Sequence, residues 1–354
     1  MTTFTDKTKI EIFCGTGGVG KTTLATSRAI FLSSQGKKIL LITIDPSKRL
    51  KQILNLSESD AGQTHQVQFE TKLETSSITE LDAILMSPTH TFQEMNLSSE
   101  KKNKILEILM RPNGGMNEIM AIIEVQKQIN SKKYDVIVLD TPPGKHFLDF
   151  LKATQKIDRF FDKSFVEIFK YFGKKFKSSK IGFAPKKVIG LVVSTGLKKL
   201  LKYLELVTGK EFVEEFVDAI FTLYNNKEKF VAALSFQKFL ESDSSYELFL
   251  VASTEQQKLD EILEIQKKST HFSSEKTSVL INKSIKKRLD LVDDENLIKE
   301  ELTILEYFKM LEEKVSQFSS QYFGKFRTFE ESISTSPKDQ VYDLIKEWEV
   351  YDKE

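Results

Sequence analysis

Short apolar runs alternate with longer amphipathic stretches over most of the chain. Two of the runs, 39–44 and 134–140, are apolar on both faces, as strands in the middle of a parallel sheet are. The predicted strands are 10–14, 39–44, 134–140, 248–252 and 277–283, and the helices predicted between them by apolar spacing include 23–33, 117–129 and 256–267. This alternation predicts an α/β fold with a doubly wound, mostly parallel sheet.

The remaining segments carry other patterns. Further predicted elements are a short alternating strand at 67–73, a helical pattern at 79–108 interrupted at Ser87-Pro88, helices at 197–207 and 212–223, a strand-like run at 189–193, and helix-like segments to 318 and from 337 to about 348. We expect three parts: 1–146 and 241–354 form the core, the latter with C-terminal helices, and 147–240 is an inserted helical subdomain.

A glycine-rich loop separates the first strand from the first helix. Its spacing, G-x-x-x-x-G-K-[ST], is that of a phosphate-binding loop, so the sheet is predicted to be of the P-loop NTPase type. Glycines let backbone N–H groups turn toward phosphate oxygens, Lys21 supplies a charge to the β- and γ-phosphates, and Thr22 offers a hydroxyl to Mg²⁺. The predicted nucleotide-binding residues of the loop are Gly15, Thr16, Gly17, Gly18, Val19, Gly20, Lys21, Thr22 and Thr23.

Polar side chains end three of the predicted strands, at the sheet edge where open α/β sheets bind ligands. Asp45 follows the run 39–44, where it either orients an attacking water or caps the next helix. Asp140 ends a Walker-B-like strand and is predicted to hold Mg²⁺ together with Thr22 and Asp45. Asn282 ends the strand 277–283, where it either contacts an adenine edge or caps a turn. The predicted catalytic residues are Lys21 and Asp45.

Composition excludes several functions. The chain has 354 residues with 52 Lys+Arg against 51 Asp+Glu, and this near-zero net charge gives no reason to expect a nucleic-acid partner. Cys14 is the only cysteine, which excludes an internal disulfide and a multi-cysteine metal site. Residues 1–9 lack an apolar signal core, and no stretch approaches the ~20 apolar residues that span a bilayer. We therefore expect a cytoplasmic protein.

Four segments together, 15–23, 43–46, 139–143 and 281–283, resemble the ArsA family of ATPases, and most closely its short bacterial members. That family contains arsenite-pump ATPases and the guided-entry ATPase that targets tail-anchored membrane proteins, and it belongs to the deviant Walker A group of dimeric ATPases. The resemblance implies ATP and Mg²⁺ as ligands and a homodimer that ATP closes. It also implies that Asp45 polarises the hydrolytic water, that Asp140 is the switch acid and that Asn282 contacts adenine.

The chain departs from the family pattern at three points. It has Thr16 where the deviant loop carries a signature lysine that reaches the partner's nucleotide, and it has no Cys-x-x-Cys to clamp a zinc between subunits. With Cys14 alone, an arsenite site built of three thiolates is excluded. The arsenite-pump subunit has two fused ATPase halves, and this chain has one phosphate loop.

The sequence therefore predicts a Mg²⁺-dependent ATP hydrolase that captures or escorts a hydrophobic client or membrane protein. The Phe-rich, Lys-rich segment 147–239 supports this, although core packing and contact with an anionic membrane surface stay open as readings of it. The alternative function is a slow, nucleotide-switched scaffold that binds a partner protein or membrane surface, as division-site and partition ATPases do. A GTPase is disfavoured, because residues 282–285 contain only the first half of an Asn-Lys-x-Asp element.

Overall fold

The computed structural model describes residues 8–44, 47–71, 77–95, 104–109, 117–144, 146–147, 203, 205–226, 228, 230, 246–269, 274–293, 297–322 and 325–353. The chain forms two compact units. The first consists of Met1–Ser87, Val125–Leu151 and Gln237–Glu354, and the second of Pro88–Glu124 and Lys152–Phe236.

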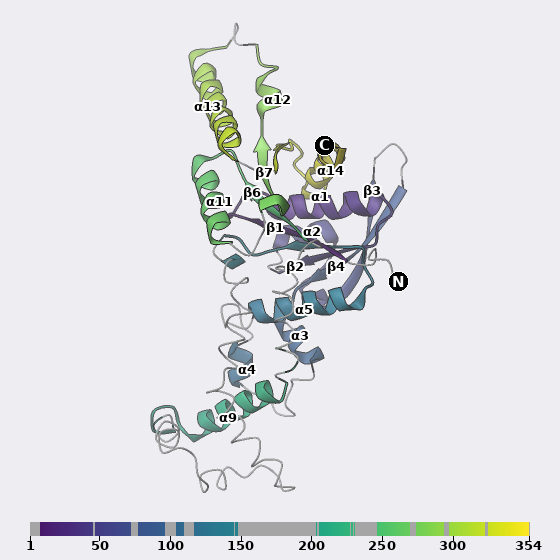
Figure 1. Cartoon of the computed structure of the whole chain (residues 1–354), viewed down its shortest axis with the longest axis vertical. Helices are drawn as coiled ribbons and strands as arrows, with labels where there is room; N and C mark the ends of the chain where they lie inside the picture. The colour runs from purple at the N-terminus through teal and green to yellow at the C-terminus, as the bar shows by residue number, and fades with distance from the viewer. Residues whose placement is uncertain are drawn as a thin grey trace. The chain divides into compact units, whose positions relative to one another are not determined.

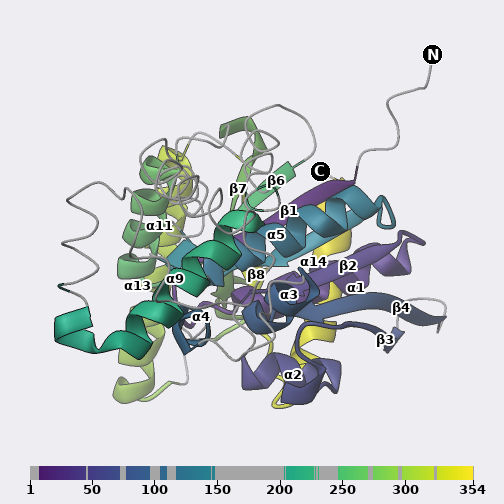
Figure 2. The same ribbon diagram turned by 90° about the horizontal axis from the view of Figure 1, so that it is seen from below.

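The first unit is built on an eight-stranded sheet with the order β3-β4-β2-β5-β1-β6-β7-β8 (Figures 1 and 2). Every neighbouring pair is parallel except β3 and β4, which are antiparallel. The strands are β1 Lys9–Gly15, β2 Ile39–Thr43, β3 Thr64–Thr71, β4 Ser77–Leu85, β5 Val136–Asp140, β6 Tyr246–Ala252, β7 Thr277–Ser284 and β8 Lys325–Glu330. The α/β class and the mostly parallel sheet predicted from the sequence are confirmed.

Helices cover both faces of this sheet. In Figure 1, α1 lies along one face with α14 beside it, and the part of α5 that belongs to this unit, from Val125 on, lies on the opposite face. The helices are α1 Lys21–Ser34, α2 Lys48–Leu54, α3 Pro88–Glu94, α4 Lys104–Leu109, α5 Asn117–Ser131, α9 Lys210–Asn225, α11 Gln256–Lys268, α12 Lys286–Leu289, α13 Lys299–Gln321 and α14 Pro337–Lys353. Among the described helices, none is both long enough and apolar enough to cross a membrane.

The central strands are buried on both faces, which explains why their sequences are almost continuously apolar. All five residues of β2 and all five of β5 are buried, and β6 has only Glu247 partly exposed. The strands predicted at 10–14, 39–44, 134–140, 248–252 and 277–283 correspond to β1, β2, β5, β6 and β7, and the short strand predicted at 67–73 overlaps β3. The predicted helices at 23–33, 117–129, 256–267 and 212–223 correspond to α1, α5, α11 and α9.

Two strands differ from the sequence prediction. Residues 79–85 were expected to be helical but belong to β4, which pairs with β3 and β2. Over 79–83 the burial alternates with a period of two: Thr79, Leu81 and Ala83 are buried, Glu80 is exposed and Asp82 is partly exposed. Pairing on both sides outweighs a local pattern that also fits a helix. Strand β8 was not predicted at all, because only Phe329 of its residues is buried and the others are partly or fully exposed.

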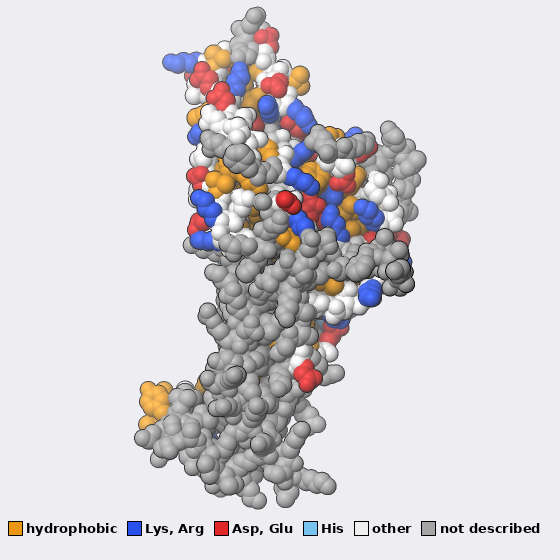
Figure 3. Space-filling model, in the orientation of Figure 1, with side chains coloured by type: hydrophobic (Ala, Val, Ile, Leu, Met, Phe, Trp, Pro, Cys, Tyr) orange, Lys and Arg blue, Asp and Glu red, His pale blue; other side chains and the backbone are white. Residues whose placement is uncertain are grey.

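Much of the segment 147–239 lies outside the described residues, including the strand-like run at 189–193 and most of the helix predicted at 197–207. Within the second unit, α9 runs over Lys210–Asn225, and Glu211 and Glu215 pair with Lys104 of α4. Over the described surface visible in Figure 3, Lys and Arg are interspersed with Asp and Glu.

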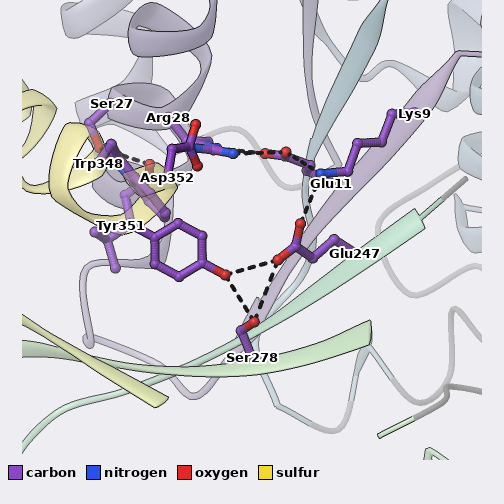
Figure 4. Close-up of polar contacts among 10 residues, drawn as sticks. Lys9, Glu11, Ser27, Arg28, Glu247, Ser278, Trp348, Tyr351 and Asp352 are labelled. Carbon is purple, nitrogen blue, oxygen red and sulfur yellow. Dashed lines mark hydrogen bonds and ion pairs between the residues drawn. The ribbon is translucent and has the colours of Figure 1, made fainter. Parts of the chain in front are cut away.

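A buried polar network fixes the C-terminal helix α14 against the sheet and α1 (Figure 4). Glu11 of β1 is fully buried and accepts two hydrogen bonds from Arg28 of α1, at 2.8 and 3.1 Å. Arg28, which is 3% exposed, also pairs with Asp352 of α14 at 2.8 Å. Lys9 bonds to Glu11 at 3.0 Å and to Glu247 at 2.8 Å. The network therefore connects β1, α1, β6 and α14.

The single tryptophan lies at the centre of this contact. Trp348 of α14 is fully buried and donates a hydrogen bond from Nε1 to Ser27 Oγ at 2.8 Å. Its ring packs on Phe13, Phe249 and Phe329, and the Arg28 guanidinium lies 4.9 Å from its centroid. These contacts hold α14 in place, and residues near the start of α14 form part of the site described next.

Candidate active site

The loop between β1 and α1 has a backbone that requires glycine. Gly18 and Gly20 have φ angles of 80° and 83°, in the left-handed region. A Cβ on Gly20 would lie against the side-chain amide nitrogen of Asn282, and a Cβ on Gly15 would meet the carbonyl oxygen of Val251. The loop is therefore packed tightly between β1, β6 and β7, with its N–H groups at the start of α1.

Asp140 connects the loop to the neighbouring strands. Its Oδ1 accepts a hydrogen bond from Lys21 Nζ at 3.0 Å. Its Oδ2 accepts from Thr22 Oγ1 at 2.8 Å and from Thr43 Oγ1 at 2.9 Å. Lys21 also donates to the Thr141 carbonyl. Lys21 and Asp140 are both largely buried, at 9% and 3% exposure. Removal of either side chain would therefore leave the charge of the other one buried without its ion-pair partner.

The turn after Asp140 is attached to the strand that carries the loop. Thr141 donates to the Phe13 carbonyl from both its backbone nitrogen, at 3.2 Å, and its hydroxyl, at 2.8 Å. The Gly144 N–H donates to the Gly15 carbonyl at 2.9 Å. These bonds tie residues 141–144 to β1 and to the first residue of the loop.

Thr16 takes the position at which a lysine was expected from the family pattern. Its side chain is 2% exposed, and its hydroxyl has no hydrogen-bond partner. A buried hydroxyl without a partner is costly unless a ligand satisfies it. The orphaned Thr16 hydroxyl in this glycine-rich loop therefore fits a bound phosphate group.

A pocket of about 430 Å³ opens over the loop. Asn282 forms part of its wall and is fixed there by a hydrogen bond from Nδ2 to the Val19 carbonyl at 2.9 Å. All of Thr16 to Thr23 lines the pocket, so the structure brings the predicted loop residues together with Asn282. The other lining residues are Ser47, Arg49, Pro143, Lys283, Glu331, Ser332, Gln340 and Leu344.

Sequence reasoning missed several of these lining residues. Ser47 and Arg49 lie at the start of α2, Glu331 and Ser332 directly after β8, and Gln340 and Leu344 in α14. They follow no motif, and Gln340 and Leu344 lie on α14, which packs on α1. The sequence did predict the helix from 337 that carries Gln340 and Leu344, but a predicted helix start does not indicate a pocket.

Asp45 lies outside the described residues. The helix that follows is capped by Ser47, whose Oγ accepts a hydrogen bond from the Leu50 N–H at 3.1 Å. The capping role considered for Asp45 in the sequence is therefore filled by Ser47.

The oxygen atoms of Thr22 and Asp140 are hard donors of the kind that Mg²⁺ prefers. Within the described ranges, no group of three or more His, Cys, Asp or Glu side chains is placed to hold a metal ion. Thr22 and Asp140 alone give two protein oxygens, which fits an ion that shares its coordination with phosphates and water rather than one held in an all-protein site.

Comparison with known proteins gives a consistent result. A family model described as anion-transporting ATPase matches residues 8–333. The chain is 34% identical over 169 residues to ATPase GET3 of Malassezia globosa, covering 46% of each protein. It is 27% identical over 287 residues to the putative arsenical pump-driving ATPase 2 of Aquifex aeolicus, covering 78% of this chain and 80% of that protein. The chain thus spans less than half of that GET3 and most of the Aquifex protein.

Proposed function

Since this chain belongs to the anion-transporting ATPase family, whose members are ATP hydrolases, we propose that it uses Mg²⁺ and ATP at the loop of residues 15–23 to capture or escort a hydrophobic client protein. The observation that carries the proposal is the meeting of Lys21, Thr22 and Asp140. These residues come from a phosphate loop and a Walker-B-like strand, and their hydrogen bonds place a cation, a hydroxyl and a carboxylate beside the pocket.

The protein groups have separate roles in nucleotide binding. The backbone N–H groups of the loop and the hydroxyl of Thr16 bind phosphate oxygens, and Lys21 neutralises the β- and γ-phosphates. Asn282 forms the wall on which the base rests. Gly20 must be glycine for Asn282 to approach this closely. Mg²⁺ held by Thr22 and Asp140 would neutralise charge that develops on the phosphates.

Nucleotide binding requires Lys21 to exchange partners. In the structure the ammonium of Lys21 is bound to Asp140 and to the Thr141 carbonyl. When Lys21 turns to a phosphate, Asp140 becomes available for the metal and residue 141 loses a hydrogen bond. The turn at 141–144, which is tied to β1, is thereby sensitive to the presence of the γ-phosphate. Asp45 is proposed to orient the attacking water.

A hydrophobic client is favoured over an arsenical. Cys14 is fully buried in β1, and burial raises the pKa of its thiol above the ordinary value. A single buried thiol cannot provide the several thiolates that arsenite binding needs. The guided-entry role implied by the sequence resemblance remains. We also propose that the protein acts in the cytoplasm as a homodimer.

The client role is tested with a defined probe. A soluble carrier ending in one apolar membrane-spanning segment is mixed with the purified full chain and ATP, and complex formation is measured by size-exclusion chromatography. The matched carrier has three arginines within the segment. We expect a complex with the apolar carrier only, and its loss in Lys21→Ala but not in Lys37→Ala, which removes an exposed lysine beyond α1.

Two results would contradict the client role: equal binding of both carriers, or binding that is indifferent to nucleotide and to Lys21→Ala. If the protein instead binds anionic vesicles in an ATP-dependent and salt-sensitive way, without the carrier, the nucleotide-switched scaffold is the better description.

A further inference from the structure

The glycine-rich loop provides only one cation, Lys21, to neutralise a bound triphosphate. A nucleoside triphosphate carries more negative charge than Mg²⁺ and one lysine neutralise. The loop itself offers no second cation, because position 16 is a threonine whose side chain is buried. Among the described lining residues, the cations are Lys21, Arg49 and Lys283, and Lys21 is held by Asp140. The remaining charge has to come from another element of the fold.

Arg49 is placed at the pocket by the geometry of α2. The helix begins directly after Ser47, whose side chain caps it, so Arg49 lies in the first turn. Leu50, Ile53 and Leu54 are buried at 0%, 4% and 2% exposure and anchor the helix on the core. This leaves the neighbouring Arg49 exposed on the side that lines the pocket. The helix therefore fixes the backbone of Arg49 at the edge of the pocket.

The partner of Arg49 is a weak one. Its guanidinium Nη2 donates to Gln340 Oε1 of α14, and Gln340 lines the same pocket. Gln340 in turn donates from Nε2 to the Ser334 carbonyl at 2.6 Å. In the part of the chain that the structure describes, no carboxylate pairs with Arg49. A neutral amide is a poorer partner for a guanidinium than a phosphate, which accepts two charge-assisted hydrogen bonds.

We propose that Arg49 is a second phosphate-binding cation of this site, supplied by the same chain as the loop. With nucleotide bound, the guanidinium leaves Gln340 and binds phosphate oxygens, and so supplies charge that Thr16 cannot. This inference rests on the proposed ATP site and deepens it. It also gives the link between α2 and α14 a function, because the Arg49–Gln340 bond joins two walls of the pocket.

Binding measurements on the full chain separate this role from a structural one. The probes are Mg²⁺ with a non-hydrolysable ATP analogue, and adenosine, both titrated calorimetrically. For Arg49→Gln we expect an affinity for the analogue that is roughly 10- to 100-fold lower, an unchanged affinity for adenosine, and partial recovery in Arg49→Lys. The matched control Lys48→Gln removes a neighbouring exposed charge and should change neither affinity.

The outcomes distinguish the two proposals. If the unaltered chain binds no analogue, or binds it equally well as Lys21→Ala, the ATP site itself is wrong. If Lys21→Ala abolishes binding while Arg49→Gln binds normally, only the role of Arg49 is wrong. An equal loss of adenosine affinity in Arg49→Gln would also overturn it, since that indicates a distorted pocket.

A separate experiment tests whether Arg49 binds the nucleotide of its own chain. Lys21→Ala retains Arg49, and Arg49→Gln retains Lys21. If Arg49 serves its own chain, an equimolar mixture of the two variants hydrolyses ATP at the average of their separate rates. A rate clearly above that average would mean that Arg49 reaches a partner's nucleotide, and it would refute supply within one chain.

Discussion

Replacing Glu11 with glutamine should destabilise the sheet unit while leaving its shape almost unchanged. Glu11 is fully buried in β1, and its carboxylate compensates Arg28, which is also buried. The amide of glutamine has nearly the same size and still accepts one hydrogen bond. It removes the charge, however, and leaves a buried guanidinium with only one carboxylate.

The expected magnitude follows from what Arg28 retains. Removal of one partner of a buried ion pair costs about 3–5 kcal/mol. Arg28 keeps Asp352 at 2.8 Å and the ring of Trp348 at 4.9 Å. Because the side chain of Asp352 is 37% exposed, it compensates only in part. We therefore expect a loss of about 3 kcal/mol, roughly a hundredfold in the unfolding equilibrium.

The assay is urea unfolding followed by the fluorescence of Trp348, which is the only tryptophan and is fully buried against Arg28. The matched control is the double variant Glu11→Leu/Arg28→Met, which removes both charges and should lose less stability than Glu11→Gln alone. An unchanged unfolding midpoint for Glu11→Gln, or a double variant as unstable as the sum of both single changes, would refute the reasoning.

Three further predictions concern the site and its support. Gly20→Ala should lower ATP affinity at least about tenfold in calorimetry, because Gly20 has a φ of 83° and a Cβ would meet Asn282; unchanged affinity would count against this packing. Asn282→Ala should lower it by up to about tenfold, and a larger effect on adenosine than on inorganic triphosphate is expected if the amide forms the base wall. Burial alone would raise the pKa of Glu11, but Arg28 outweighs it and holds that pKa below the ordinary value. The ionised Glu11 carboxylate therefore stabilises the fold fully above its ordinary pKa of about 4.3, and this stabilisation is lost as the pH falls through the lower pKa of the folded protein. Acid unfolding followed by tryptophan fluorescence should therefore be less steep in Glu11→Gln. Identical acid titrations of the two proteins would contradict this.

The parts of the fold that could be predicted are those whose determinants are residues close together in the sequence. Runs such as 39–44 and 134–140 are apolar throughout because both faces of β2 and β5 are buried. The phosphate loop is recognisable for the same reason, since its glycines, Lys21 and Thr22 are neighbours in sequence. Asp140 could be placed near the loop because the carboxyl ends of parallel strands share one edge.

What could not be predicted depends on contacts between distant segments. β4 was read as helix because its strand character comes from pairing with β3 and β2 rather than from a decisive local pattern. Arg49 and Gln340 are 291 positions apart, and nothing in either segment indicates that they meet. The buried partners of Arg28 likewise come from β1 and from the last helix, so charge patterning along the chain does not reveal them.

The central claim is that Lys21, Thr22 and Asp140 form an ATP-hydrolysing site with Mg²⁺. The most direct measurement is phosphate release from ATP by the purified full chain with Mg²⁺ or with EDTA, for the unaltered protein, Lys21→Ala, Asp140→Asn and the control Lys37→Ala. The account predicts hydrolysis that needs Mg²⁺, is abolished in Lys21→Ala, is strongly reduced in Asp140→Asn and is retained in Lys37→Ala. Hydrolysis that persists in EDTA, or that is unaffected by Lys21→Ala, would contradict it.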